Sequence, residues 1–569
     1  MSFSSSGRCR PDPLDVVPRD EPSRGIHRVP QEGPLASAYM PPQVSATTAF
    51  EIGELSPAAF PHAVTGFRVI ETHISWVVLT GSFAYKIKKP VRYDFLDAST
   101  LELRRELCEE ELRLNRRLAP DLYVDVLHLT RDGGQIKVGG SGSAVEYAVR
   151  MREFDPSQDL ATQLEVGSVR LSDLRSLAIK IAEFHRHAAV AAPETPLGDV
   201  ASIRAQIVDN VAVLEQCLEQ PEDIAAIRRL DNWLRRSLAE SKPLLALRKR
   251  DGSVRECHGD LHAHNIVRWR QQWTPFDCIE FNPDLRWIDV FSDVAFLFMD
   301  LVAHGRRDLA HGFLSRYLEE TGDYDGLRLL PLYAVYRALV RAKVDALGAK
   351  SASAEGARAL RERQARRLRV AADLIRPPLP ALLITHGVAA CGKSWLSERL
   401  VPELHAVRVR SDLERKRLAG MEALEISRSG IGENLYDAAV TDYLYARLRA
   451  CAESALAGGL SVIVDAAFLE AGQREQFRQL ATRQQVPFLI LSCHAGTSIL
   501  HARLDERAGT GRDPSEATRA VLDHQLATHE PLSAQEETYA LRIDTSSLTN
   551  VDVVVDAVKD RLRGSRRVS

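Results

Sequence analysis

The feature that most constrains the fold is an eight-residue stretch, GVAACGKS, at residues 387–394. It fits the pattern G-x-x-x-x-G-K-[ST], follows the strand-like run ALLIT and precedes the helix-like run SWLSERL. In that context the glycines let the backbone turn its N–H groups towards phosphate oxygens at a helix N-terminus. The stretch predicts a strand–loop–helix unit that binds phosphate, and a chance glycine-rich turn is the alternative interpretation.

The residues of this loop are candidate ligands of ATP. Lys393 is expected to reach the terminal phosphates, and the hydroxyl of Ser394 is expected to ligate Mg²⁺. The remaining positions contribute mainly their backbone N–H groups. The candidate nucleotide-binding set is Gly387, Val388, Ala389, Ala390, Cys391, Gly392, Lys393 and Ser394.

Short apolar strands alternate with helical segments in the last third of the chain, which predicts a parallel five-stranded sheet in a βαβ arrangement. Asp465 and Asp412 end two of these strands, where α/β folds place their chemistry. We expect Asp465 to hold the metal directly or through water. Asp412 is expected to accept a proton from an acceptor hydroxyl while Arg415 orients the acceptor; a helix N-cap with an exposed arginine is the alternative.

The segment HARLDERAGTGRDPSEA carries three arginines that fit a lid. Arg503 and Arg507 are four residues apart and share a helix face, and Arg512 follows a Gly-Thr-Gly stretch. Arginines on a mobile segment can screen the charge of a phosphoryl group in transfer. A solvated charged face is the simpler interpretation.

A second phosphotransfer motif, CHGDLHAHN, lies near the middle of the chain. The spacing H-x-D-x-x-x-x-N, as in kinase-like catalytic loops, predicts Asp260 beside an acceptor hydroxyl and Asn265 on Mg²⁺, with His258 supporting the loop. A zinc cluster is the rival hypothesis, but one short loop with no second ligand pair is a weak zinc signal. Its ligands would be Cys257, His258, His262 and His264.

Further residues complete this second site if it is kinase-like. Asp277 and Glu280 both qualify as the second metal carboxylate, and the run CIEF favours Glu280. Lys86, on a third predicted strand, is expected to pair with the phosphates and with Glu111, Glu110 being the fallback. Asp293 reads as a helix-start carboxylate that bonds to the catalytic loop.

The composition divides the chain into four parts. Residues 1–43 are proline-rich and without periodicity, so we expect a disordered tail. Residues 44–374 read as a bilobal α+β domain, with a small β-rich lobe at about 44–150 and a large helical lobe at about 151–374. A proline-rich linker at 375–380 leads into an α/β domain at 381–563. The expected fold class is multidomain: a protein-kinase-like bilobal domain followed by a P-loop NTPase domain.

These motifs resemble known families. Residues 380–563 resemble the P-loop small-molecule kinases of the gluconate-kinase and polynucleotide-kinase group, of AAA type, and the resemblance implies acceptor-binding roles for Asp412 and Arg415. Residues 44–374 resemble the aminoglycoside phosphotransferase and choline-kinase-like superfamily, through THISWVVLTGSFAYKIKKPV, HGDLHAHNIV and DVFSDVAFLFMDL. The whole chain is similar to bacterial fusions of these two domains. The first half departs from the family in lacking a G-x-G-x-x-G loop and in placing Glu280 where aspartate is usual.

Charge and cysteine usage narrow the function further. The net charge is −3, which gives no field argument for binding nucleic acid or an anionic membrane, and no apolar run reaches the ~18 residues of a membrane helix. Eight scattered cysteines are typical of reduced thiols in the cytoplasm. We therefore expect a cytoplasmic, ATP- and Mg²⁺-dependent phosphotransferase with two nucleotide sites and a small hydroxyl-bearing substrate. The alternatives are a regulatory N-terminal half with little turnover, and a nucleotide-driven regulator of another protein.

Overall fold

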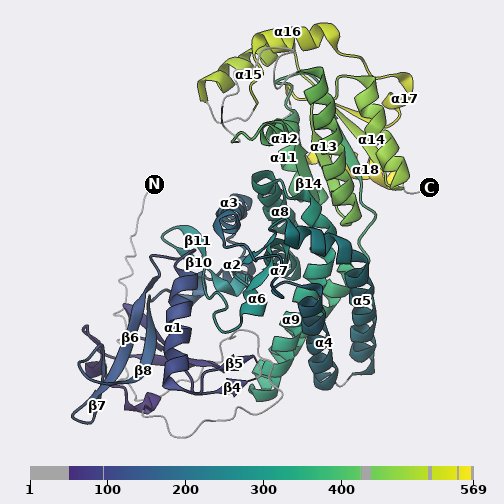
Figure 1. Cartoon of the computed structure of the whole chain (residues 1–569). Helices are drawn as coiled ribbons and strands as arrows, with labels where there is room; N and C mark the ends of the chain where they lie inside the picture. The colour runs from purple at the N-terminus through teal and green to yellow at the C-terminus, as the bar shows by residue number, and fades with distance from the viewer. Residues whose placement is uncertain are drawn as a thin grey trace, which may run out of the picture.

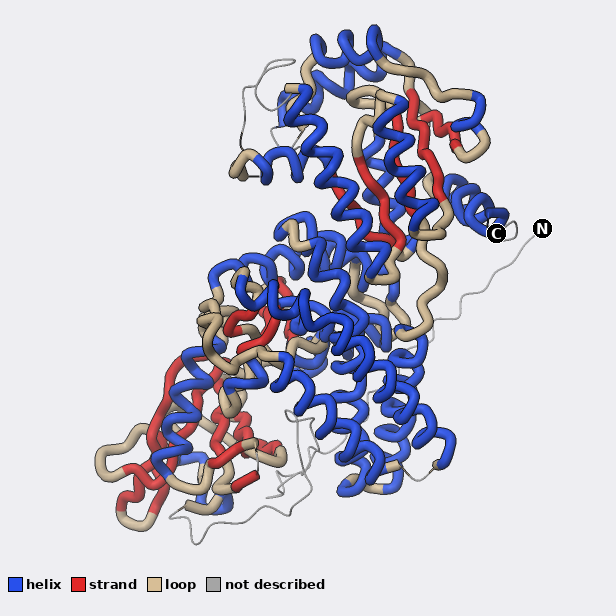
Figure 2. Tube along the Cα trace, turned by 45° about the vertical axis from the view of Figure 1, so that its right-hand side comes forward, coloured by secondary structure: helices blue, strands red, loops and turns tan. Residues whose placement is uncertain are grey.

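The chain forms an elongated molecule in which three regions follow one another (Figures 1 and 2). The computed structural model describes residues 50–565 except 94, 219, 423–424, 426–436, 511–514 and 548–549. A β-rich lobe lies at one end, helices fill the middle, and a mixed α/β region lies at the other end. We call residues 50–374 the N-terminal half and residues 381–565 the P-loop half. The predicted disordered tail, residues 1–43, lies outside the described residues.

The small lobe is an antiparallel sheet with one helix packed on it. Its six strands run in the order β1-β2-β3-β8-β6-β7, and α1, at Leu101–Asn115, packs against β6 and β8. The hydroxyl of Thr100 caps α1 by accepting from the N–H of Leu103 at 3.2 Å. The strands are β1 (Arg68–Glu71), β2 (Ser75–Leu79), β3 (Phe83–Lys88), β6 (Tyr123–Asp132), β7 (Gln135–Val138), β8 (Ala144–Arg152) and a separate hairpin of β4 (Arg92–Tyr93) and β5 (Leu96–Asp97).

The large lobe is mainly helical, and its centre is α7, at Val290–Ala303. Every residue of α7 is buried, which is why its sequence is apolar on nearly all sides. No helix in the described part of the chain combines the length and apolar composition needed to cross a membrane. The other elements are α2 (Leu160–Glu165), α3 (Leu171–His187), α4 (Val200–Cys217), α5 (Pro221–Arg250), β9 (Val254–Glu256), η4 (Ala263–Asn265), β10 (Ile266–Trp269), β11 (Gln272–Pro275), α6 (Pro283–Arg286), β12 (Trp287–Asp289), α8 (Arg307–Thr321), η5 (Tyr324–Leu329), α9 (Leu330–Ser351) and α10 (Ala354–Leu374).

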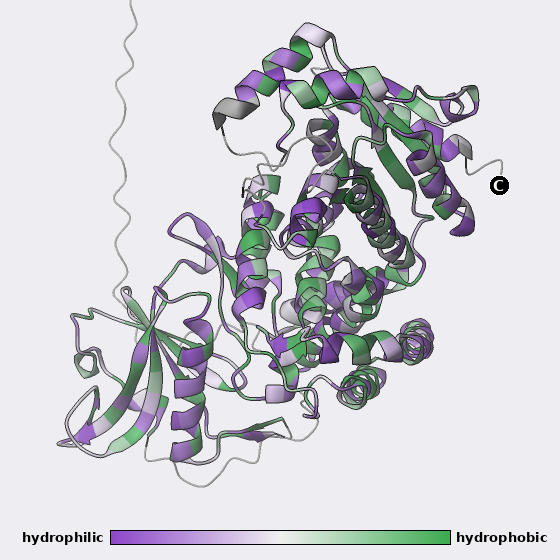
Figure 3. Ribbon diagram, turned by 45° about the horizontal axis from the view of Figure 1, so that its top comes forward, coloured by the Kyte–Doolittle hydropathy of each residue, from purple (hydrophilic) through white to green (hydrophobic). Residues whose placement is uncertain are grey.

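The P-loop half contains the predicted parallel five-stranded sheet, in the order β14-β15-β13-β16-β17. Its central strands are buried on both faces by helices, as their continuous apolar sequences require (Figure 3). The strands are β13 (Leu382–His386), β14 (Ala406–Arg410), β15 (Ser461–Asp465), β16 (Phe488–His494) and β17 (Ala540–Asp544). The helices are α11 (Lys393–Leu404), α12 (Ser411–Leu418), α13 (Ala438–Ala457), α14 (Ala471–Arg483), α15 (Thr497–Thr510), α16 (Arg519–Thr528), α17 (Ala534–Glu537) and α18 (Asp552–Ser565).

The two halves are packed together through a continuous hydrophobic core. Leu314 of α8 and Leu327 of η5 belong to the same buried cluster as Val407 of β14 and Leu448 of α13. Helix α8 contacts both α11 and β14, and η5 contacts α13 (Figure 1). The edge strand of the parallel sheet is thus covered by the N-terminal half, which removes an exposed edge. The proline-rich stretch at 375–380 therefore joins two halves that are packed against each other.

Candidate active sites

The phosphate loop adopts a conformation that only glycine allows at two positions. Gly387 has φ 135° and Gly392 has φ 89°, both in the left-handed region. A Cβ placed on Gly387 would lie 2.4 Å from the carbonyl oxygen of Cys493, so no side chain fits there. Helix α11 begins at Lys393, directly after the loop. The backbone of residues 387–392 therefore forms a close-fitting cradle at a helix N-terminus, where phosphate binds favourably.

Nine of the predicted residues line one cavity of about 880 Å³, among them Ala389, Ala390 and Gly392 of the phosphate loop and Arg503 of α15. The other five come from three elements that meet at the carboxyl edge of the sheet: Lys393 and Ser394 from α11, Asp412 and Arg415 from α12, and Asp465 from β15. This edge is where α/β folds bind their ligands. The cavity therefore brings together the phosphate cradle, the Ser394 hydroxyl, the Asp465 carboxylate, and the side chains of Asp412 and Arg415.

The part of this cavity around Asp465 offers hard oxygen atoms of the kind that Mg²⁺ prefers. The Oδ2 atom of Asp465 accepts a hydrogen bond from the hydroxyl of Ser397 at 3.0 Å, and Asp465 is buried. The Nζ atom of Lys393 donates to the carbonyl oxygen of Val388 at 2.7 Å, folded back over the loop. A carboxylate, a serine hydroxyl and a glycine cradle fit a magnesium-bound triphosphate.

Two residues of this cavity have no signal in the local sequence pattern. The Oε1 atom of Gln525, on α16, accepts from the N–H of Ala389 at 2.7 Å, so it contacts the loop directly. Tyr445, on α13, lines the cavity near Asp412 and Arg415. Burial raises the pKa of Tyr445 to about 12, so it stays a neutral phenol. Neither residue belongs to a recognisable motif, because each reaches the cavity from a helix distant in sequence.

The predicted lid arginines are only partly described. Arg503 contacts the base of the phosphate loop: its guanidinium donates to the carbonyl oxygen of Ala390 at 3.2 Å and to that of Thr545 at 2.7 Å. It also lines the cavity. Arg507 lies on α15, but its side chain is outside the described residues, as is Arg512.

The second site is a buried network of two lysines and three carboxylates. Lys86 and Lys88 are two residues apart on β3, so both point to one face of the sheet. Lys86 Nζ lies 2.8 Å from Glu111 Oε1 and 2.5 Å from Asp277 Oδ1. Lys88 Nζ lies 2.5 Å from Glu111 Oε2 and also contacts Glu280. Each lysine therefore joins the helix carboxylate to one of the two candidate metal carboxylates.

Charge pairing determines the protonation of this network. Burial alone would raise the pKa of Glu111, but Lys86 and Lys88 outweigh it and lower the value to about 2. Burial raises the pKa of Glu280 above its ordinary value, although Lys88 opposes the effect. Glu110, the fallback partner of Lys86, pairs instead with Arg113 and Arg286. Lys88 was not identified from the sequence, although its spacing from Lys86 was a usable signal.

The catalytic-loop motif forms a tightly hydrogen-bonded turn. Asp293 of α7 accepts the N–H groups of His258 at 2.7 Å and of Gly259 at 2.9 Å. Asn265 donates to Asp260 Oδ2 at 3.0 Å. The N–H of Phe276 donates to the carbonyl oxygen of Asn265 at 2.9 Å, so the residue that follows, Asp277, begins next to Asn265.

Asp260 has an oxygen available for a ligand. Its Oδ1 atom is buried and has no hydrogen-bond partner within the described ranges. Burial alone would raise the pKa of Asp260, but His262 and Arg341 outweigh it and lower the value to about 2. The side chain is thus a carboxylate at neutral pH, and an unpaired buried carboxylate oxygen fits a hydroxyl donor or a cation.

Within the described residues, the three histidines of this loop do not cluster as metal donors would. His258 contacts the carbonyl oxygen of Phe276, His262 contacts Asp260 and Arg341, and His264 contacts Asp159. Of the residues that the structure describes, the potential metal donors that cluster closely are His185, Cys257 and Asp293, which share only Cys257 with the zinc hypothesis. His185 is bonded to the hydroxyl of Tyr317, and Asp293 to the catalytic loop.

Comparison with known proteins gives both halves a family. Residues 98–330 match the model of the phosphotransferase enzyme family, and residues 382–532 match an AAA domain model. Uncharacterized proteins of Mycobacterium tuberculosis and Mycobacterium bovis are 30% identical over 454 residues, which cover 80% of this chain and 89% of each relative.

Solved structures are similar to parts of the chain. A choline/ethanolamine kinase family protein from Mesorhizobium loti is 14% identical and covers 57% of this chain and 94% of its own, with a TM-score of 0.35. A gluconokinase from Sinorhizobium meliloti is 20% identical and covers 33% of this chain and 94% of its own, with a TM-score of 0.23. A putative kinase from Chloroflexus aurantiacus is 22% identical and covers 32% of this chain and all of its own, with a TM-score of 0.26.

Proposed function

Because the chain belongs to a family that joins a phosphotransferase-family domain to a C-terminal AAA domain with a P-loop, we propose that both halves transfer the γ-phosphoryl group of ATP to a hydroxyl of a small molecule. ATP-dependent phosphotransfer is the general chemistry of the two domain families. The observation that carries the proposal is the meeting of Lys393, Ser394, Asp412 and Asp465 on one cavity.

In the P-loop half, we propose a role for each residue from its position in the cavity. The loop N–H groups and Lys393 orient the phosphates, with Lys393 leaving its resting contact on Val388. Ser394 and Asp465 hold Mg²⁺, which supplies charge neutralisation of the transferring group. Asp412 accepts the proton of the acceptor hydroxyl, and Arg415 orients the acceptor.

In the N-terminal half, Asp260 is the proposed base because its Oδ1 atom is buried, charged and without a partner in the described part of the chain. Asn265 and Asp277 are the proposed metal ligands. We favour Asp277 over Glu280 because Asp277 is adjacent to Asn265 and contacts Lys86, the expected phosphate-binding lysine. Glu280 is instead paired with Lys88 and is almost fully buried.

The test is a screen of the full-length protein for ATP-dependent phosphorylation. A panel of polyols, amino sugars and nucleosides is incubated with ATP and Mg²⁺, and products that gain one phosphate are detected by mass spectrometry. We expect Lys393→Ala and Asp260→Ala to abolish separate products. The matched controls are Arg399→Ala, an exposed residue of α11, and Asp251→Ala, an exposed residue before the catalytic loop.

The outcomes separate the proposal from its alternatives. If the products depend on Lys393 and not on Asp260, the N-terminal half is a regulatory or ligand-sensing module. If neither variant changes any product, the proposal is wrong. The same screen in the absence of Mg²⁺ tests the metal requirement. We further propose that the protein acts in the cytoplasm on a small molecule, with neither nucleic acid nor a membrane as partner.

A further inference from the structure

The N-terminal half contacts the P-loop half at Arg408, which lies next to the two proposed magnesium ligands of the P-loop half, Ser394 and Asp465. Arg408 lies on the edge strand β14, and two residues of the N-terminal half bond to its backbone. Its N–H donates to the hydroxyl of Ser315 at 3.0 Å, and its carbonyl oxygen accepts from the hydroxyl of Tyr324 at 2.9 Å. These bonds fix the strand at the point where its side chain turns towards the phosphate loop.

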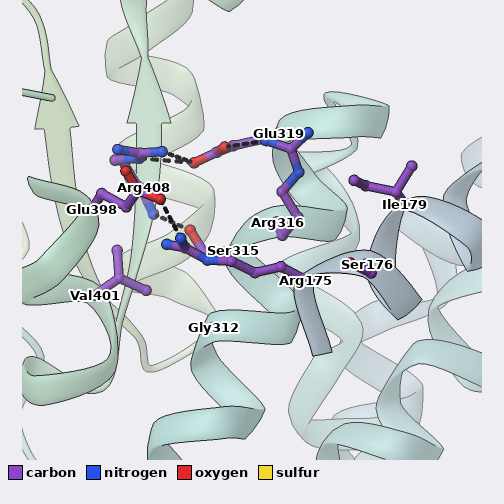
Figure 4. A pocket seen from close by; sticks show the side chains of 10 residues that line it. All are labelled: Arg175, Ser176, Ile179, Gly312, Ser315, Arg316, Glu319, Glu398, Val401 and Arg408. Carbon is purple, nitrogen blue, oxygen red and sulfur yellow. Dashed lines mark hydrogen bonds and ion pairs between the residues drawn. The ribbon is translucent and has the colours of Figure 1, made fainter. Parts of the chain in front are cut away.

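The side chain of Arg408 connects the two halves (Figure 4). On one side, its Nε and Nη2 atoms lie 2.7 Å from Oε1 of Glu319, a residue of α8. On the other side, Nη1 lies 3.1 Å from the carbonyl oxygen of Ser394 and 3.3 Å from the hydroxyl of Ser397. The same Nη1 atom is 4.0 Å from Oδ2 of Asp465. Arg408 thus contacts the first turn of α11 and lies near the metal-facing carboxylate.

The charges explain why the guanidinium stays between these groups. Glu319 and Arg408 are both buried, as is Asp465. Burial alone would raise the pKa of Glu319, but Arg408 and two other arginines outweigh it and lower the pKa, so Glu319 is an anion at neutral pH. Glu319 is the nearer carboxylate, and it supplies the counter-charge that would otherwise come from Asp465.

We propose that Glu319 is a positioning residue for the magnesium site of the P-loop half. It holds Arg408 so that the guanidinium orients the Ser394–Ser397 turn and leaves Asp465 free to accept the cation. The inference rests on the proposed function of the P-loop site. It predicts that the P-loop half needs the N-terminal half to bind Mg²⁺–nucleotide well, even where the two halves act on different substrates.

Loss of the Glu319 charge gives a specific result. Arg408 then has Asp465 as its nearest remaining carboxylate on the loop side and competes with Mg²⁺ for it. Removing an outer-shell partner of a metal ligand weakens metal affinity by about 10–100-fold. We therefore expect Glu319→Gln to raise the Mg²⁺ concentration needed for half-maximal nucleotide binding by about 10-fold, while nucleotide affinity without Mg²⁺ stays within about 2-fold.

The experiment measures equilibrium binding of a fluorescent ATP analogue to full-length protein over a Mg²⁺ titration. The signal of the P-loop site is the part that Lys393→Ala removes. The matched control is Asp325→Asn, the same acid-to-amide change in another residue of the N-terminal half, which accepts from Ser454 across the interface at 2.8 Å and is remote from the loop. We expect this control to leave the Mg²⁺ midpoint unchanged.

A second variant makes the test independent of how well Glu319→Gln folds. Lysine at position 408 cannot contact Glu319 and Ser394 at once, so Arg408→Lys should shift the Mg²⁺ midpoint in the same direction. The inference is wrong if the folded variants keep the wild-type midpoint, or if Asp325→Asn shifts it equally. If the wild-type protein has no Mg²⁺-dependent binding that Lys393→Ala removes, the proposed function itself fails, and the two failures are distinguishable.

Discussion

Removing Lys88 should destabilise the N-terminal half strongly, because among the described residues this lysine is the cation that forms an ion pair with the Glu280 carboxylate. Lys88 is 2% exposed and also contacts Glu111 at 2.5 Å. The variant Lys88→Met keeps most of the side-chain volume and removes the charge. It leaves Glu111, Asp277 and Glu280 to share Lys86, so one buried carboxylate loses its counter-charge.

The expected cost follows from the burial of the pair. Breaking a buried ion pair by removing one partner costs about 3–5 kcal/mol, because the other charge is left in a poor solvent. Unfolding entropies of about 2 cal/mol/K per residue give about 1 kcal/mol/K for a chain of this size, so the loss corresponds to a fall in Tm of about 3–5 °C. The double variant with Glu280→Gln should recover about 2 kcal/mol, since it neutralises the orphaned group.

The loss of unfolding free energy in Lys88→Met should depend on pH in one direction. The pKa of Glu280 is already raised by burial, and loss of Lys88 raises it further. A carboxyl group with a raised folded-state pKa destabilises the protein as the pH rises through the window between its unfolded and folded values, and it has no effect below that window. The deficit of Lys88→Met should therefore shrink as the pH falls towards the unfolded-state pKa of a glutamate, about 4.3.

Differential scanning calorimetry of the full-length protein at several pH values measures these effects. The matched control is Lys89→Met, which removes a neighbouring lysine whose partner, Glu71, is partly exposed, and which should cost less than about 1 kcal/mol. A deficit for Lys88→Met no larger than that of the control would refute the reasoning. So would a deficit that grows as the pH falls.

Three further predictions concern the two candidate sites. Gly387→Ala should lower the nucleotide affinity of the P-loop site by at least about 100-fold in a nucleotide titration, because the new Cβ would lie 2.4 Å from a backbone oxygen. The φ of 135° adds backbone strain of about 1–3 kcal/mol. The control is Gly472→Ala, whose Cβ meets nothing within 4 Å. Asp260→Asn should lower kcat of the N-terminal reaction by about 10²–10⁴-fold and leave KM for ATP nearly unchanged, as measured by steady-state kinetics. An equal fall in kcat and in KM would contradict the role of Asp260 as a base. Because the pKa of Asp260 is lowered to about 2, this base stays ionised down to about pH 3, so kcat should show no loss from it between pH 7 and about pH 5, and a titration near pH 4–5 that Asp260→Asn removes would count against the assignment.

The sequence alone was sufficient for the parts of this protein whose chemistry is local. The phosphate loop is eight consecutive residues between a strand and a helix, and Asp260 and Asn265 are five residues apart in one short segment that ends with η4. The five strands of the parallel sheet were all predicted, and the three central ones are mainly apolar runs. Local backbone geometry and burial on both faces leave a direct signature in the order of residues.

Only the tertiary structure decided how these parts are combined. The sequence favoured Glu280 over Asp277 as metal ligand, and the pairing of each with a different lysine across more than 190 residues was needed to reverse that preference as a proposal. The sequence contains no pattern that indicates the contact of Gln525 with the phosphate loop, or the contact of Glu319 with Arg408 near Asp465. These contacts join segments distant in the chain, and their geometry depends on the packing of whole helices and strands, which no short residue pattern records.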